Sequence, residues 1–127
     1  RLIFNRPDLL KRVNAAVHPS VLRCFDAWAS VKDAPYVIME SAILFEAGAD
    51  ALLDRVVTIS APVEERIARV TYRNRLTREQ VLERIDNQID DHDRIKLSDY
   101  VINNAENEMI IPAILRIHED LLNHLNS

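Results

Sequence analysis

The chain has 127 residues, 48% of them apolar, and a formal net charge of −4. This length suits one domain, and the acidic balance argues against a nucleic-acid binder, since affinity for a polyanion comes mainly from Lys and Arg. No apolar run reaches the length of a membrane-spanning helix. The single cysteine, Cys24, excludes an internal disulfide and fits a reducing compartment. We therefore expect a cytoplasmic protein that binds neither nucleic acid nor a membrane.

Glycine is scarce in this sequence. Average usage of roughly 7% would give about nine glycines, and the chain has one, Gly48. A phosphate-cradling loop of the form Gly-x-x-x-x-Gly-Lys-Ser/Thr needs two, so these residues cannot contain that loop. The chain also opens with RLIFNRPDLL rather than with Met, and we expect a piece of a longer chain.

The first part of the chain combines helical and strand patterns. Apolar residues recur at helical spacing on both sides of His18-Pro19, where we expect a break because proline disfavours helix in the residue before it. The apolar run at residues 36–39 then predicts a buried strand, and this run stops on a carboxylate, Glu40. The expected elements are two helices, a strand and a short helix, at residues 7–17, 20–29, 36–39 and about 49–53.

The second part predicts strands that alternate with helices. Pro62 suits the first turn of a helix, and Thr77 with Gln80 has the form of a capping box. The expected elements are a strand, two helices, a strand and a final helix, at residues 55–60, 62–72, 77–88, 99–102 and about 107–125. This alternation predicts parallel pairing and an α/β layered fold.

Two acids follow the first expected strand. Ligands bind beyond the carboxyl ends of strands in open parallel sheets, so Glu40 could orient a water or a hydrated magnesium ion. A solvated or arginine-paired acid is the plainer interpretation. Glu46, after Leu44 and Phe45, is the weaker candidate taken alone.

Arginines are concentrated in the middle of the chain, where seven of the thirteen lie between residues 66 and 94. Arg66, Arg69 and Arg73 share one helix face, and two helices joined by a short turn would form a cation-rich hairpin. Arginine suits phosphate because its planar fork donates two parallel hydrogen bonds. The alternative is a solvated surface in which glutamates pair with these arginines at i, i+4 spacing.

The histidines do not indicate a metal site. His18 lies at the expected junction of two helices, where capping or packing is the commoner role, and the other three show no metal-ligand spacing. With Cys24 as the only cysteine, zinc binding is not expected.

These segments, in this order, resemble the dephospho-coenzyme A kinases, a family of P-loop kinases. The resemblance rests on IFNRPDLLKRVNAAVHP, VIMESAILFE, RIARVTYRNRLTREQVLERIDNQ and SDYVINN. It implies a partial three-layer α/β kinase fold, with a parallel sheet and helices on both faces, that lacks its N-terminal central strand. Ala42 departs from the family, which has a proline there, and leaves the backbone path after Glu40 open.

The resemblance also implies a role for each part of a single partial domain, 1–127. Residues 1–34 and 43–54 would form the substrate side, 64–97 an arginine-rich lid, and 35–42, 55–63 and 98–127 the nucleotide side. The lid arginines Arg69 and Arg73 would stabilise the transferring phosphoryl group. The other implied site residues are His18, Leu44, Phe45 and Glu46 for dephospho-coenzyme A, Arg73, Asn103 and Asn104 for ATP, and Glu40 for Mg²⁺ through water.

The family's Walker A loop and its activating aspartate would precede this chain, so these residues alone should not catalyse. An incomplete sheet could also lead copies to associate. Two alternatives remain open: another small-molecule or nucleotide kinase of the same architecture, and a non-catalytic helical module whose arginines decorate a surface.

Overall fold

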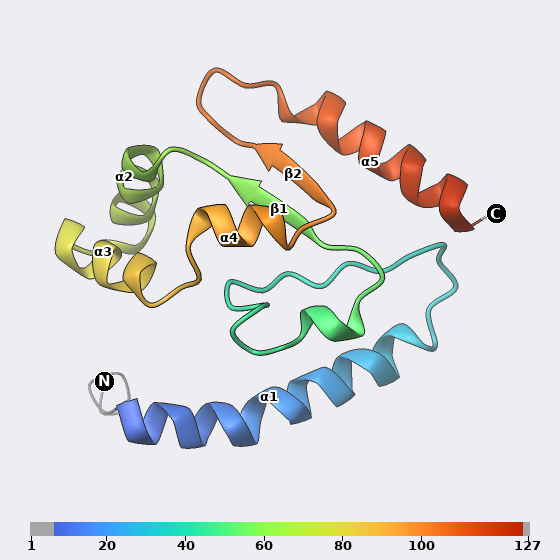
Figure 1. Ribbon diagram of the computed structural model, residues 1–127, viewed down its shortest axis with the longest axis horizontal. Helices are drawn as coiled ribbons and strands as arrows, with labels where there is room; N and C mark the ends of the chain where they lie inside the picture. Colours follow the sequence, from blue (N-terminus) through green and yellow to red (C-terminus); the bar gives the residue numbers. More distant parts are fainter. Residues whose placement is uncertain (1–6, 126–127) are drawn as a thin grey trace. The chain divides into compact units, whose positions relative to one another are not determined.

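The computed structural model describes residues 7–125, which contain five α-helices, one 3₁₀ helix and two strands (Figure 1). The chain divides into two compact units, Arg1–Ala42 and Ile43–Ser127. Within the described range, no helix combines the length and apolar character needed to cross a membrane.

The first unit is dominated by one continuous helix, α1 (Pro7–Ala29), with Pro19 inside it. The predicted break at His18-Pro19 is therefore wrong. An interior proline removes one hydrogen bond and costs about 3 kcal/mol. A helix propagates cooperatively once formed, and the helix-forming turns on both sides of Pro19 outweigh this single defect.

The strand predicted at residues 36–39 is also wrong, because this segment forms no regular strand. Its Ile38 side chain is 76% exposed. An apolar run reports a preference for extended, buried backbone, but a strand also needs a hydrogen-bonded neighbour. The neighbour that the family resemblance implies for it, a central strand, is not found within residues 7–125.

The second unit opens with a helical turn that ends at Gly48. The Ala49 N–H donates to Leu44 O and the Gly48 N–H to Phe45 O, each at 3.0 Å. These two bonds form a Schellman motif. Gly48 takes a φ of +65°, which glycine adopts without steric cost. The 3₁₀ helix η1 (Asp50–Leu52) follows, where a short helix is expected.

The sheet consists of β1 (Val57–Ser60) and β2 (Tyr100–Asn103), which pair in parallel. This confirms the second and third predicted strands and their parallel pairing. The final helix, α5 (Ile110–Leu125), packs on β2, and α4 (Asp91–Lys96) packs on β1 (Figure 1). The buried apolar residues of the described chain are Ala49, Val56, Ile67, Val81 and Ile102.

Helices α2 (Val63–Asn74) and α3 (Arg78–Asp86) form the predicted arginine-rich hairpin. The predicted capping box is present: Gln80 N–H donates to Thr77 Oγ1 at 3.3 Å, and Thr77 N–H donates to Gln80 Oε1 at 3.0 Å. Arg78 closes the hairpin with a two-bond fork to Glu64, at 2.6 and 2.7 Å. That hydrogen bond lowers the pKa of the Glu64 carboxyl.

Helix α4 was not predicted from the sequence, because its six residues, DHDRIK, carry almost no apolar pattern. The sequence features that favour this helix are electrostatic. Asp90 caps the helix by accepting from the His92 N–H at 2.8 Å. Acids occupy the first turn and bases the last, as the helix dipole favours. These end signals could have revealed the helix where apolar periodicity could not.

Candidate active site

Arg69 joins the hairpin to the loop that follows β2. Its Nη1 donates to the Asn104 carbonyl at 2.8 Å, and its Nη2 donates to Glu65 Oε2 at 2.9 Å. The same Glu65 oxygen accepts the Glu106 N–H at 2.9 Å. Since the loop lies at the carboxyl end of the parallel sheet, where ligands bind in such folds, the structure brings together two residues that the sequence singled out separately, Arg69 and Asn104.

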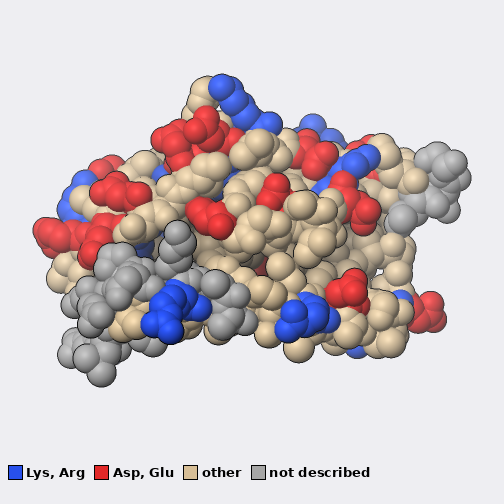
Figure 2. Space-filling model, turned by 60° about the horizontal axis from the view of Figure 1, so that its bottom comes forward, with Lys and Arg blue, Asp and Glu red and all other residues tan. Residues whose placement is uncertain are grey.

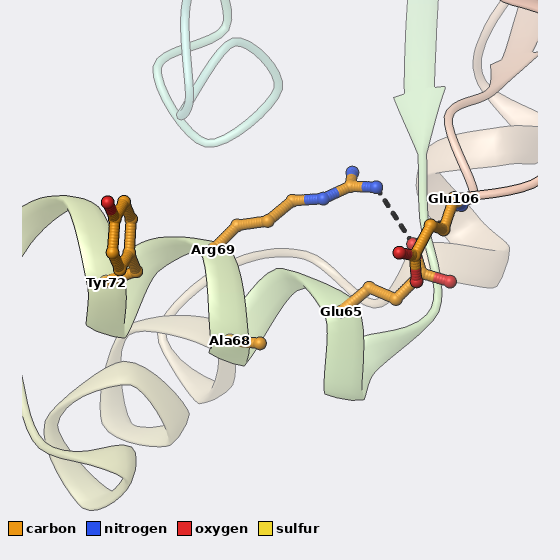
Figure 3. A pocket seen from close by; sticks show the side chains of 5 residues that line it. All are labelled: Glu65, Ala68, Arg69, Tyr72 and Glu106. Atoms are coloured by element: carbon orange, nitrogen blue, oxygen red, sulfur yellow. Dashed lines mark hydrogen bonds and ion pairs between the residues drawn. The ribbon is translucent and has the colours of Figure 1, made fainter.

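An open groove of about 350 Å³ runs beside this contact. It is lined by Glu65, Ala68, Arg69 and Tyr72 of α2 and by Glu106 of the loop before α5 (Figure 3). Figure 3 shows the Arg69 side chain extended toward Glu65 and Glu106 at one end, with the Tyr72 ring one turn further along α2. Tyr72 is 92% exposed, so its ring is available to a ligand in the groove.

Arg73 lies outside the lining of this groove. Its Nε donates to the neighbouring Asn74 Oδ1 at 3.1 Å, on an exposed part of the hairpin. Asn103 has a different partner from Asn104, since its Nδ2 lies 3.5 Å from Glu108 Oε1. The structure therefore does not bring Arg73 and Asn103 to the Arg69–Asn104 contact.

Leu44, Phe45 and Glu46 share the helical turn that Gly48 ends. The side chains of Leu44 and Phe45 are half-buried, whereas Glu46 is exposed. The Glu46 carboxylate accepts the backbone N–H of Ile89 at 2.7 Å. Thus this turn contacts the segment that joins α3 to α4.

A half-buried ionic cluster lies between α2 and α4. Asp91 accepts from both Arg66 and Arg94, and the Nη1 of Arg66 lies 3.3 Å from Asp91 Oδ1. Burial lowers the pKa of the Arg94 guanidinium, and the nearby charge of Arg66 adds to that effect. Sequence reasoning did not single out Asp91 and Arg94 as a pair. Their i, i+3 spacing on a short helix with opposite charges was the available signal.

His18 and Glu40 belong to the first unit. His18 is half-buried on α1, and Glu40 is exposed in the segment that follows residues 36–39. Among residues 7–125, no group of three or more His, Cys, Asp or Glu side chains is arranged to hold a metal ion. On the visible face of the described residues, Lys and Arg are interspersed with Asp and Glu (Figure 2).

Comparison with known proteins identifies the family. The family model described as dephospho-CoA kinase matches residues 1–109. The chain belongs to the dephospho-CoA kinase family. A dephospho-CoA kinase of Thermus thermophilus is 38% identical over 105 residues, covering 83% of this chain and 52% of the relative. One from Bacteroides fragilis is 37% identical over 116 residues, covering 91% and 57%.

The fold agrees with this family. A crystal structure of a Thermus thermophilus protein, 34% identical, superposes with a TM-score of 0.79 and covers 100% of this chain and 65% of that one. The prediction of an α/β P-loop kinase fold is thereby confirmed. The chain spans about half the length of the curated dephospho-CoA kinases it matches.

Proposed function

We propose that the full-length protein transfers the terminal phosphoryl group of ATP to the 3′-hydroxyl of dephospho-CoA, the last step of coenzyme A synthesis. Beyond the family match, the observation that carries this proposal is the Arg69 contact. It places a guanidinium from the hairpin at the carboxyl end of the sheet, against the loop assigned to the nucleotide. In phosphoryl transfer, catalysis consists mainly of positioning and of neutralising charge on the phosphate oxygens.

Arg69 can change partners at small cost. The Arg69 side chain is 45% exposed, and the Glu65 side chain is 27% exposed. Exposed ion pairs of this kind contribute roughly 0–1 kcal/mol. A phosphoryl group with two or more negative charges can therefore compete for the guanidinium when the hairpin closes. Arg73, one turn beyond Arg69 on the exposed tip of α2, is the second arginine that we assign to the phosphoryl group and to ATP.

The remaining roles follow the division of the chain that the family resemblance implies. Residues 1–34 and 43–54 would receive dephospho-CoA through His18, Leu44 and Phe45, with Glu46 in the same turn. The loop after β2, with Asn103 and Asn104, would border the adenine of ATP. The base that accepts the 3′-hydroxyl proton would belong to the preceding part of the family's fold.

A magnesium ion fits these residues only as an ion held chiefly by the nucleotide. Mg²⁺ in kinases keeps several waters and uses one or two carboxylates plus substrate phosphates. One exposed acid, Glu40, is available as the carboxylate for such an ion, which needs no preformed cluster of acidic side chains. When bound, the ion neutralises charge on the phosphate oxygens. Glu40 would orient one of its waters.

We further propose that the isolated 127 residues associate through their incomplete sheet. Within residues 7–125 the sheet has two strands, so each strand keeps one outer edge. Unpaired strand edges recruit other chains.

For the full-length protein we propose a cytoplasmic location, which the single exposed Cys24 supports because a free thiol persists in a reducing compartment.

A chimera tests the proposed function. The N-terminal part of the T. thermophilus relative, up to its matched region, is fused to this chain and assayed for coenzyme A formation from ATP, Mg²⁺ and dephospho-CoA. We expect turnover by the chimera and none by either part alone. Nucleosides and nucleoside monophosphates serve as competing acceptors. A folded chimera that phosphorylates one of these and not dephospho-CoA would identify a nucleotide kinase instead.

A further inference from the structure

The Glu46 carboxylate accepts a hydrogen bond from the backbone at one foot of the arginine-rich hairpin. We call the two ends of the hairpin its feet: the start of α2 and the segment between α3 and α4. Glu46 accepts the Ile89 N–H at 2.7 Å, across 43 residues of sequence. Ile89 lies between the end of α3 at Asp86 and the start of α4 at Asp91. A bond from an N–H to an ionised carboxylate is stronger than a neutral one. The turn assigned to dephospho-CoA thus contacts the C-terminal foot of the lid.

Asp91 fixes the other foot of the hairpin. It accepts from Arg66, near the start of α2, and from Arg94 on its own helix. Helix α4 is in turn attached to the sheet, because Ser98 Oγ donates to the Arg94 carbonyl at 2.9 Å and lies 2.6 Å from Thr58 Oγ1. Both feet of the hairpin therefore connect to the core, while its tip, residues 74–77, is largely exposed.

The charges around Arg94 make Glu46 more than a hydrogen-bond acceptor. Two guanidinium groups, Arg66 and Arg94, share one carboxylate, and the Nε atoms of both are shielded from solvent. The charge of Glu46 favours the protonated form of Arg94 and opposes the effect of burial on its pKa. Glu46 thus stabilises the cluster at the foot of the hairpin as well as the Ile89 N–H.

We propose that Glu46 is a positioning residue that holds the foot of the lid hairpin against the acceptor-side turn, so that Arg69 and Arg73 reach the transferring phosphoryl group from a fixed base. Arg69 lies one turn beyond Arg66 on α2, and Arg73 lies two turns beyond it. If the foot of the hairpin shifts by about 1 Å, both arginines are displaced, and such a misplacement can cost up to a hundredfold in rate. The inference rests on the proposed function.

Amide hydrogen exchange in the full-length protein tests the contact without reference to activity. The Ile89 amide should be protected in the wild type and in Glu46→Gln, whose amide oxygen still accepts a hydrogen bond. In Glu46→Ala we expect that protection to be lost, with the β1 and β2 amides unchanged. Glu83→Ala, an exposed acid on α3, is the matched control and should behave as the wild type. Equal Ile89 protection in Glu46→Ala would overturn the proposal.

Kinetics of the full-length protein test the positioning role. Glu46→Ala should lower kcat roughly tenfold to a hundredfold with smaller changes in KM, and Glu46→Gln should recover most of the rate. A higher KM for dephospho-CoA in both variants at unchanged kcat would show a substrate contact instead and overturn the proposal. If the wild type forms no coenzyme A while Ile89 protection still depends on Glu46, the contact stands and the proposed function fails.

Discussion

Arg69 and Arg73 lie on the same helix, α2, and their side chains have different hydrogen-bond partners. Arg69 is held between Glu65 and the Asn104 carbonyl. Arg73 engages Asn74 through Nε alone among the described residues. Its two terminal nitrogens can therefore donate to a phosphoryl group without first breaking a bond. In the proposed reaction, Arg69 orients the hairpin toward the nucleotide loop and Arg73 completes the neutralisation of charge.

Replacing Arg73 in the full-length protein should therefore affect the chemical step. We expect Arg73→Ala to lower kcat about a hundredfold or more, because an interaction made chiefly in the transition state is lost. The KM for dephospho-CoA should change far less. Steady-state kinetics measure both. Arg84→Ala, an exposed arginine on α3, provides the control. If Arg73→Ala keeps the wild-type kcat, Arg73 is a surface residue and the lid assignment fails.

At the scale of single residues, the sequence predicts which kinds of side chain are present better than it predicts which groups those side chains contact. It predicts an arginine-rich helix face, to which the family resemblance adds Asn103 and Asn104, and the structure shows that Arg69 contacts the Asn104 backbone carbonyl. It cannot indicate that Glu46 holds an amide 43 residues away. That contact depends on where the segment after α3 returns to the core, which no local pattern encodes.

At the scale of elements, predictions succeed where the signal and the stabilising contact are both local. The capping box of Thr77 and Gln80 forms as predicted because its two bonds lie within four residues. The β-branched run before Ser60 finds its parallel partner in β2. The strand predicted at residues 36–39 fails because its stability depends on a neighbour. Helix α1 passes Pro19 because cooperativity overrides one unfavourable residue.

The contact between β2 and α5 gives the fold a dependence on alkaline pH. The Tyr100 hydroxyl donates to Asp120 of α5, and this bond raises the pKa of Tyr100 above its usual value of 10.0. Ionisation would remove the donor and place two negative charges together. Because the folded-state pKa is the higher one, the stabilisation is complete below about pH 10 and is lost as the pH rises through the folded-state value.

The thermal unfolding midpoint between about pH 8 and pH 11 checks this expectation. Tyr100→Phe should be less stable than the wild type at the lower end of this range, and the difference should shrink as the pH rises above about 10. Tyr72→Phe is the control, since that tyrosine is 92% exposed. It should follow the wild type throughout. A constant difference between wild type and Tyr100→Phe over this range would contradict the assigned pKa shift.

At the scale of the whole molecule, the described core is thin and its coverage uneven. No large side chain in the described range is fully buried. Residues opposite one another in a parallel ladder point to the same face, so Ile59 shares a face with Ile102. Ile102 is 6% exposed, yet Ile59 is 62% exposed and Val57 39%. The β1 side of this face thus lacks a cover, beside a strand edge that has no partner in the described sheet.

The isolated 127 residues should consequently associate and should not catalyse. With no phosphate-cradling loop, they should form no coenzyme A above background from ATP, Mg²⁺ and dephospho-CoA, and measurable turnover would overturn the proposed location of the catalytic machinery.

Sedimentation velocity should show a mean mass that rises with concentration in the micromolar range. Ile59→Lys should reduce this association, because a charge on an edge strand opposes pairing. Tyr72→Lys, on the exposed face of α2, should leave it unchanged. A wild-type chain that stays monomeric would contradict the proposed association. An association that Ile59→Lys leaves unaffected would place the contact away from the sheet.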